Sequence, residues 1–217
     1  MAPGIPDPAA RIRLAALCGM AAPLTFFGTV LLLGFLRPDY SHVTRLMSEL
    51  GVAGAPYAIV MNLTGLALTG VLLMIFSTGI HATLGKHRGG TLGSLFVAVI
   101  GIAFLGTAVF SCDTGCVPVT MAGSLHNRLG MIGMLATAIS AFLLALAMRK
   151  AGDWNGYWQY SLITGVAILL LAFASPSLPD VKGIIQRLMV GTAFLWAGVV
   201  AIRLYRGAGR PSPGTGG

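Results

Sequence analysis

Long apolar stretches separated by short polar or glycine- and proline-rich segments dominate the sequence. Six stretches are candidates for crossing a bilayer, at residues 14–36, 57–80, 91–110, 129–148, 160–174 and 184–202, and the fifth is the shortest. A spanning helix needs roughly 20 mostly apolar residues to cross about 30 Å of hydrocarbon. The pattern predicts an all-α, polytopic membrane bundle of six transmembrane helices. We expect residues 1–206 to form this single domain and the glycine-rich residues 207–217 to form a disordered tail.

The composition excludes a water-soluble enzyme. Of the 217 residues, 56% are apolar and 9% charged, and the mean hydropathy is +0.85. Soluble domains are about 45–50% apolar and about 25% charged. Disorder of the whole chain is excluded too, because it requires low hydrophobicity. Arginines precede the first apolar stretch, but this stretch is longer than the apolar region of a signal peptide, so we expect it to remain as an uncleaved helix.

The positive residues lie in short clusters between the apolar stretches, which is typical of orientation signals and not of a nucleic-acid-binding face. One side of the membrane would carry nine of them, namely Arg11, Arg13, Lys86, Arg88, Arg149, Lys150, Arg203, Arg206 and Arg210. The other would carry Arg37, Arg45, Arg128, Lys182 and Arg187. The richer side should be cytoplasmic, which places both termini inside. We expect a multi-pass protein of the cell membrane, in bacteria the inner membrane, with membrane lipids as partners and no nucleic acid.

The first outer connection, residues 37–56, contains a predicted short amphipathic helix at the membrane interface. Its apolar residues recur at helical spacing, at Val43, Leu46, Met47 and Leu50. Gly51 follows as a C-cap. Glu49 lies near the end of this helix, where the helix dipole disfavours a negative charge, so a donor such as Arg45 should hold it. Glu49 is either half of a surface ion pair or a carboxylate directed into the mouth of the bundle.

The second outer connection, residues 111–127, contains two cysteines four residues apart. Cys112 and Cys116 can close a small disulfide loop that presents Asp113, and Gly115 permits the tight turn. The spacing does not match the C-x-x-C pattern of thioredoxin-like redox sites. A metal site formed by both cysteines with Asp113 and His126 is the alternative.

Further polar residues border the apolar stretches on the outer side. We expect Glu49, Asp113, His126 and Asp180 to act as catalytic acids or bases. Asn62, Tyr40, Ser48, Gln186 and Arg187 are the candidate substrate-binding residues. Each has a structural alternative: Asn62 can join helices, His126 can bond to a loop carbonyl, Asp180 can cap the sixth helix, and Arg187 can extend outward.

One family resemblance covers most of the chain. The segments are Pro38-Asp39-Tyr40-Ser41-His42, Met47-Ser48-Glu49-Leu50-Gly51 and Gly54-Ala55-Pro56-Tyr57, followed by Asn62. Together they resemble a bacterial family of uncharacterised six-helix membrane proteins known as domain of unknown function 998. Asp113 and His126 fall where that family has its second polar cluster, whereas the cysteine pair departs from its pattern. The resemblance implies a topology and no activity.

The functional hypothesis is an integral membrane enzyme with a pocket open to the outer leaflet. Carboxylates and histidine would perform acid–base chemistry on an isoprenoid or lipid-like substrate, for example a terpene-cyclase-type reaction. A transporter or channel for small solutes and a non-catalytic assembly module are the alternatives. No nucleotide-binding, zinc-protease or hydrolase motif is present and no histidine lies in mid-span, so we expect no cofactor.

Overall fold

The computed structural model describes residues 7–208, and this range folds into long helices without strands. The helices are α1 (Pro8–Leu36), α4 (Arg88–Val109), α5 (Met121–Lys150), α6 (Tyr157–Ala174) and α7 (Lys182–Gly207), together with one composite helix. The composite helix Ala58–Leu84 consists of α2 (Ala58–Val60), the π-helical η2 (Met61–Leu68) and α3 (Thr69–Leu84). Six helices are thus long and apolar enough to span a membrane, which confirms the prediction of an all-α, multi-pass membrane protein.

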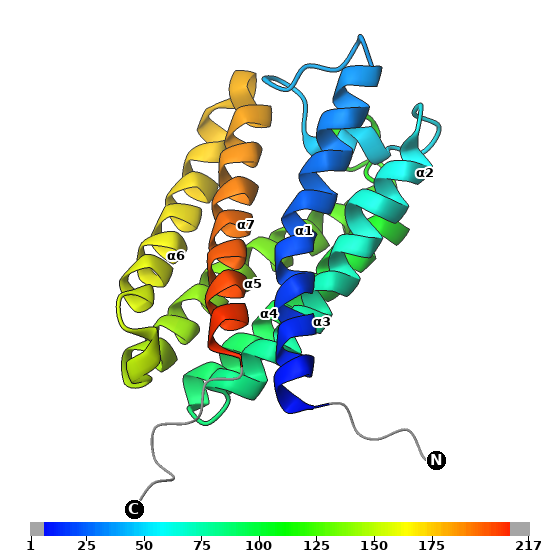
Figure 1. Cartoon of the computed structure of the whole chain (residues 1–217). Helices are drawn as coiled ribbons and strands as arrows, with labels where there is room; N and C mark the ends of the chain where they lie inside the picture. Colours follow the sequence, from blue (N-terminus) through cyan, green and yellow to red (C-terminus); the bar gives the residue numbers. More distant parts are fainter. Residues whose placement is uncertain (1–6, 209–217) are drawn as a thin grey trace, which may run out of the picture.

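Neighbouring helices in the sequence are neighbours in space. α4 packs between α3 and α5, α6 packs against α5 and α7, and α1 lies against both α3 and α7 (Figure 1). Both ends of the described chain lie at one end of the bundle (Figure 1). At that end Arg13 donates to the carbonyl of Ala208 and joins the two terminal helices. Residues 209–217, which include Arg210 and most of the expected disordered tail, lie outside the described residues.

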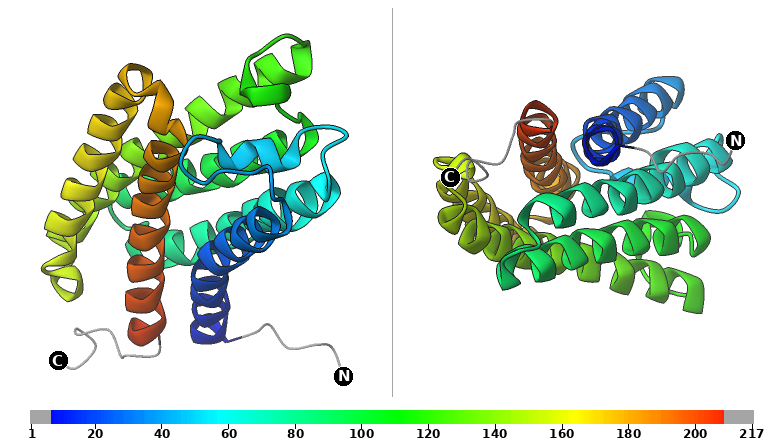
Figure 2. Two further views of the ribbon diagram at one scale, coloured as in Figure 1. Left: turned by 90° about the horizontal axis from the view of Figure 1, so that it is seen from above. Right: turned by 60° about the horizontal axis from the view of Figure 1, so that its bottom comes forward.

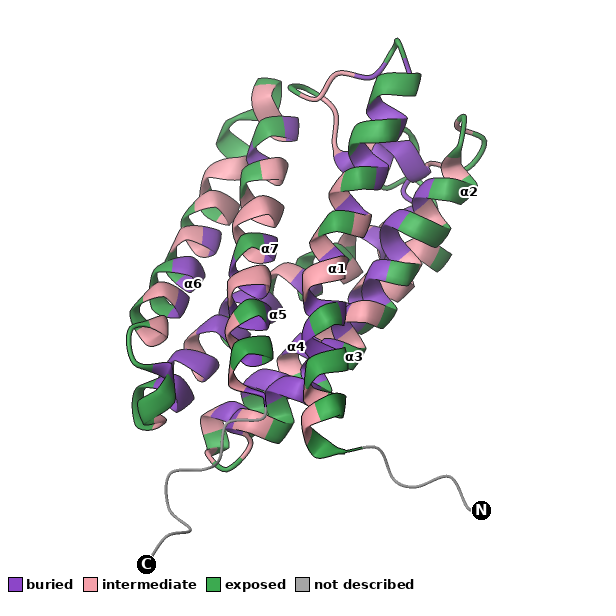
Figure 3. Ribbon diagram, in the orientation of Figure 1, coloured by how far each residue is buried: buried purple, intermediate pink, exposed green. Residues whose placement is uncertain are grey.

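Exposed residues lie along the long helices (Figure 3), and many of them are large and apolar. Leu24, Phe35 and Phe173 are 75%, 86% and 80% exposed, whereas Leu33 and Phe76 are almost fully buried. Such an exterior suits hydrocarbon, because lipid tails solvate apolar side chains without cost.

Glycines allow α3 and α4 to approach closely. A Cβ atom on Gly70 would lie 2.6 Å from the carbonyl oxygen of Gly101, and one on Gly101 would lie 2.6 Å from that of Gly70. Neither helix can carry a side chain at this crossing. These glycines therefore serve the close packing of α3 and α4.

The N-terminus of α5 differs from the sequence prediction. α5 begins at Met121 and not at residue 129, so His126 is the sixth residue of the helix. The hydroxyl of Thr120 caps the helix by accepting from the N–H of Gly123. Polar residues of the first turns find partners in the adjacent loop: Asn127 donates to the carbonyl of Cys116. An apolar-run criterion misses these turns because their polar groups are satisfied by tertiary contacts.

The amphipathic interfacial helix predicted in the first outer connection is wrong. The segment forms only a short 3₁₀ turn, η1 (Met47–Gly51), and its side chains point into the protein: Met47 and Leu50 are fully buried. Viewed from the loop end, this connection extends across the end of the bundle (Figure 2, left). It is fixed there by α7, because the N–H of Met47 donates to Gln186 and the N–H of Ile184 donates to the carbonyl of Val43.

Candidate functional site

A cavity of about 470 Å³ lies between the helices beneath the outer connections. Its size falls within the range of about 300–1,000 Å³ typical of small-molecule sites. Most of its lining is apolar and comes from all six long helices and η1. Phe26, Phe104 and Phe194 form an aromatic wall, with ring centroids 5.3–5.8 Å apart. Within residues 7–208, no Asp, Glu, Lys or Arg side chain lines the cavity.

The cavity reaches the surface of the bundle between α5 and the end of α6. Met131 on α5 is 60% exposed and also lines the cavity. On the opposite side Pro176, in the turn η5 (Ser175–Ser177) that follows α6, is exposed and lines it as well. Exposed residues on both elements show that the cavity opens to the outside of the bundle here.

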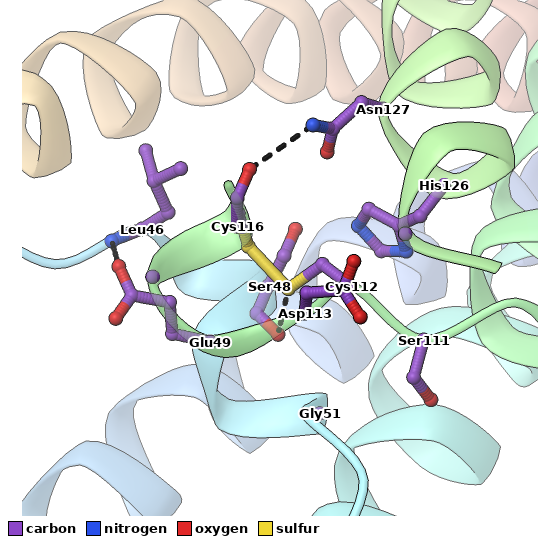
Figure 4. Close-up of a disulfide and its surroundings, with 12 residues drawn as sticks. Leu46, Ser48, Glu49, Gly51, Ser111, Cys112, Asp113, Cys116, His126 and Asn127 are labelled. Atoms are coloured by element: carbon purple, nitrogen blue, oxygen red, sulfur yellow. Dashed lines mark hydrogen bonds between the residues drawn. A yellow bond between two sulfur atoms is a disulfide. The ribbon is translucent and has the colours of Figure 1, made fainter. Parts of the chain in front are cut away.

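Polar groups of the lining gather at the loop end. They are Ser48 of η1, Cys116 in the turn η3 (Thr114–Cys116), Thr107 of α4, His126 and Asn127 of α5, and Gln186 of α7. Ser175 of η5 and Thr137 of α5 line the cavity as well, and the hydroxyl of Thr137 donates to the carbonyl of Gly133 in its own helix. Figure 4 shows His126 and Asn127 projecting from α5 towards the disulfide loop and η1. The cavity therefore has a polar end at the outer connections and an apolar remainder, as a site for an amphiphilic molecule requires.

His126 is the ionisable side chain that lines the cavity, and it is 5% exposed. Its Nδ1 lies 2.7 Å from the carbonyl oxygen of Phe110 and 3.2 Å from that of Thr107. Carbonyl oxygens only accept hydrogen bonds, so these partners assign the proton to Nδ1. Nε2 has no hydrogen-bond partner within the described residues, and unlike the amide oxygen of Asn62 it is not completely buried. Nε2 of the neutral ring is thus an acceptor available to a ligand.

Gln186 and Asn127 each use part of their amide within the protein. The Oε1 atom of Gln186 accepts from the N–H of Met47 at 2.7 Å, which leaves its NH₂ group as a donor. The NH₂ group of Asn127 donates to the carbonyl of Cys116 at 3.0 Å, which leaves its Oδ1 as an acceptor. Gln186 was predicted as a binding residue. Asn127 was missed, because the sequence around it does not distinguish an amide that lines a cavity from one that is exposed on the surface.

Glu49 is buried, but it does not line the cavity. Its Oε1 accepts from the N–H of Leu46 at 2.9 Å, as Figure 4 shows. Its carboxylate also pairs with Arg45 at 3.6 Å and with Lys182 at 3.9 Å. The predicted pairing with Arg45 is present. The group fixes η1 and is directed away from the space that a ligand could occupy.

The other two expected catalytic carboxylates also lie away from the cavity. Asp113 accepts three hydrogen bonds, from the N–H groups of Val119 and Thr120 and from the hydroxyl of Thr120. The bonds from Thr120 and Val119 hold the pKa of this carboxyl below its ordinary value. Asp180 is exposed in the turn η6 (Pro179–Val181), and no side chain caps η6 or α7.

Of the four residues expected to be catalytic, His126 lines this cavity, whereas Glu49, Asp113 and Asp180 do not. Each carboxylate meets nearer donors in its own loop or remains in solvent. The capping role considered for Asp180 is absent as well.

Arg187 joins α7 to the first outer connection. Its guanidinium donates to the carbonyls of Arg45 and Gly183, to the hydroxyl of Tyr40 and to Nδ1 of His42. Burial and the charge of Arg187 lower the pKa of His42, which keeps the ring neutral and able to accept. Burial raises the pKa of the Tyr40 phenol. Neither Tyr40 nor Arg187 lines the cavity, so both hold the loop instead of contacting a ligand.

Asn62 also has a structural role. Its NH₂ group donates to the carbonyl of Gly51 and to the hydroxyl of Ser111, which links η2 to η1 and to the second outer connection. Asn62 is absent from the lining of the cavity. This geometry fits the structural alternative for Asn62, in which it holds neighbouring segments together, better than it fits ligand binding.

Cys112 and Cys116 are joined as a disulfide, and Cys116 lines the cavity (Figure 4). Its backbone has a φ of 56°, a region that residues other than glycine seldom adopt. Within residues 7–208 no three His, Cys, Asp or Glu side chains are grouped so that they could hold a metal ion. The alternative metal site at Cys112, Cys116, Asp113 and His126 is not formed.

Comparison with known proteins identifies one family. The family model described as "Protein of unknown function (DUF998)" matches residues 20–203. No curated protein and no solved structure matches the chain.

Proposed function

Because the chain belongs to this family of unknown function, we propose its function from the cavity: it binds an isoprenoid or lipid-like molecule taken from the outer leaflet. The observation that carries the proposal is a largely apolar cavity of about 470 Å³ with a polar end at His126. The apolar chain of the ligand lies against the aromatic wall, and its polar end lies at the outer connections. The opening between α5 and the end of α6 admits the ligand from the bilayer.

Filling the cavity tests this function. Ala193 of α7 lines the cavity, so Ala193→Phe places a ring where the ligand chain would lie. Ala82→Phe is the matched control, because Ala82 lies on the exposed face of α3. Each protein is purified from the expressing membranes, and the lipids that remain bound are identified by native mass spectrometry.

We expect the wild type and Ala82→Phe to retain a defined lipid-like molecule, and Ala193→Phe to lose most of it. Equal retention by Ala193→Phe, with an unchanged melting temperature, contradicts the proposal.

A catalytic role is a second candidate, and the accessible Nε2 of His126 favours it. A neutral imidazole can accept a proton from a bound hydroxyl and so act as a general base. The carboxylate–histidine chemistry expected from the sequence is reduced here to the histidine alone. Wild type and His126→Asn are incubated with a lipid extract of the expressing cells, and the lipid masses are compared before and after.

Asparagine suits this comparison because its NH₂ group can still donate to the carbonyl of Phe110 while nothing replaces Nε2. Conversion of one lipid species by the wild type, but not by His126→Asn, supports catalysis. A ligand that is bound by both proteins and converted by neither overturns catalysis and leaves binding intact.

A further inference from the structure

The charges around the cavity restrict the chemistry of the ligand's polar end. The described part of the chain contributes no Lys, Arg, Asp or Glu to the lining. Among the cations at the loop end of the bundle, Arg187 and Lys182 are occupied by acceptors of the chain itself, whereas Arg128 on α5 is exposed and does not line the cavity. Arg187 has four such acceptors, and Lys182 pairs with Glu49 and donates to the carbonyl of Gly115.

A phosphate or carboxylate in this cavity would be buried without a cation. Removing an ion from water costs several kcal/mol unless a partner of opposite charge compensates it. Sites for anionic lipid headgroups supply such partners as clusters of Lys and Arg. The cavity lacks them, so its polar end disfavours an anionic headgroup.

The free hydrogen-bonding groups match an uncharged headgroup instead. Within residues 7–208, His126 Nε2 and Asn127 Oδ1 accept no hydrogen bond, and the NH₂ group of Gln186 donates none. A hydroxyl can both donate and accept, whereas an ether or a ketone can only accept. Because His126 is 5% exposed and two backbone carbonyls fix its ring, Nε2 is an oriented acceptor.

We infer that the ligand is a neutral lipid alcohol whose hydroxyl donates to Nε2 of His126, and that the cavity rejects the phosphate ester of the same chain. This inference rests on the proposed binding function and names the ligand class.

Three probes with one chain separate the possibilities: farnesol, farnesyl phosphate and farnesyl methyl ether. Binding of each is measured by native mass spectrometry of the protein in phosphatidylcholine nanodiscs. We expect farnesol to bind at least about 10-fold more tightly than farnesyl phosphate, because the cost of an unpaired buried ion exceeds 1.4 kcal/mol. The methyl ether cannot donate, so it should bind about 3- to 10-fold more weakly than farnesol, which corresponds to one hydrogen bond.

The variant His126→Asn identifies the acceptor. It should lower the affinity for farnesol to that of the ether and leave the affinity for the ether unchanged. A second variant, Ser48→Lys, adds a cation to the lining and should raise the affinity for farnesyl phosphate. Thr44→Lys is its control, because it adds the same charge at an exposed position of the same connection.

The outcomes distinguish the two proposals. If none of the probes binds, the proposed binding function is overturned, and this inference with it. If farnesyl phosphate binds as tightly as farnesol, the inference is overturned while the binding function stands. If farnesol and its ether bind equally to the wild type, the role of Nε2 is overturned.

Discussion

Individual ionisable side chains at the loop end differ in where their hydrogen-bonding capacity is used. The carboxylates of Glu49 and Asp113 are saturated by donors within their own loops. Both Nη groups of Arg187 likewise donate to acceptors of the chain, four in all. His126 alone combines burial, a position on the cavity and an unused ring nitrogen. At this scale the distinction between a structural and a functional group rests on which atoms remain free.

Removing the charge of Glu49 should affect stability and not binding. Glu49→Gln retains an acceptor for the N–H of Leu46 but loses the ion pairs with Arg45 and Lys182. Because both cations are partly exposed, we expect a loss of about 1 kcal/mol. Glu49→Ala also leaves the N–H of Leu46 without its partner and should cost about 2–3 kcal/mol. Melting temperature and farnesol binding are measured in parallel; loss of binding by a Glu49→Gln protein of unchanged stability would restore a direct role.

Asp113 should make the stability of the protein fall as the pH falls. Hydrogen bonds from Thr120 and Val119 lower the pKa of its folded carboxyl, so its stabilising contribution is complete above the ordinary carboxyl pKa of about 3.9. The contribution disappears as the pH falls through the lower pKa of the folded state. Asp113→Asn should therefore melt below the wild type at pH 7, and the difference should close below about pH 4. A difference that grows on acidification contradicts this assignment.

At the scale of elements, the start of α7 and the first outer connection form one unit. A Cβ atom on Gly183 would lie 2.5–2.8 Å from the carbonyl oxygens of Arg45, Val43 and His42. The N–H of Ile184 donates to Val43 across the same contact. This contact positions both Gln186 and η1, and these supply the polar end of the cavity on that side.

Gly183→Ala should separate these two elements. Overpacking of this kind costs about 1–3 kcal/mol. Gly198→Ala in the same helix is the control, because a Cβ atom there meets nothing within 4 Å and helix propensity favours alanine. We expect Gly183→Ala to lower both the melting temperature and the farnesol affinity, and Gly198→Ala to lower neither. If the two variants melt alike, the contact does not constrain the fold.

At the scale of the whole molecule, six helices enclose a cavity nearer to one end of the bundle. The cavity opens to the outside of the bundle at Met131 and Pro176, which is the entrance that the proposed function assigns to a ligand from the bilayer. The polar end of the cavity lies beneath the connections that the charge distribution places outside. Orientation in the membrane therefore decides which leaflet supplies the ligand.

Two variants, each with one added cysteine, test that orientation. Ala53 is exposed in the first outer connection, and Lys86 is exposed between α3 and α4. Because the native cysteines are a disulfide and the buried Cys18, a background without cysteines is not needed. A membrane-impermeant maleimide added to intact cells should label Ala53→Cys, and Lys86→Cys only after permeabilisation. The reverse pattern means that the cavity faces the inner leaflet.

The sequence alone predicted the features that depend on local composition. The lengths of the apolar stretches gave six spans, since every backbone group in hydrocarbon must be satisfied within a helix. The residues of the two outer connections indicated the family to which the chain belongs. The i,i+4 relation of Arg45 and Glu49 gave their ion pair. Each of these follows from residues that are close in the chain.

Only the tertiary structure decided which polar residues face the cavity. Contacts with α7 turned the apolar side of residues 46–50 inward, so the predicted surface helix became a buried turn. Neighbouring N–H groups saturated Asp113, and carbonyls of the preceding helix oriented His126 so that Nε2 stayed free. These outcomes depend on competition between partners that are distant in the chain. No pattern of spacing contains that information, because a side chain bonds to the best-placed partner in space.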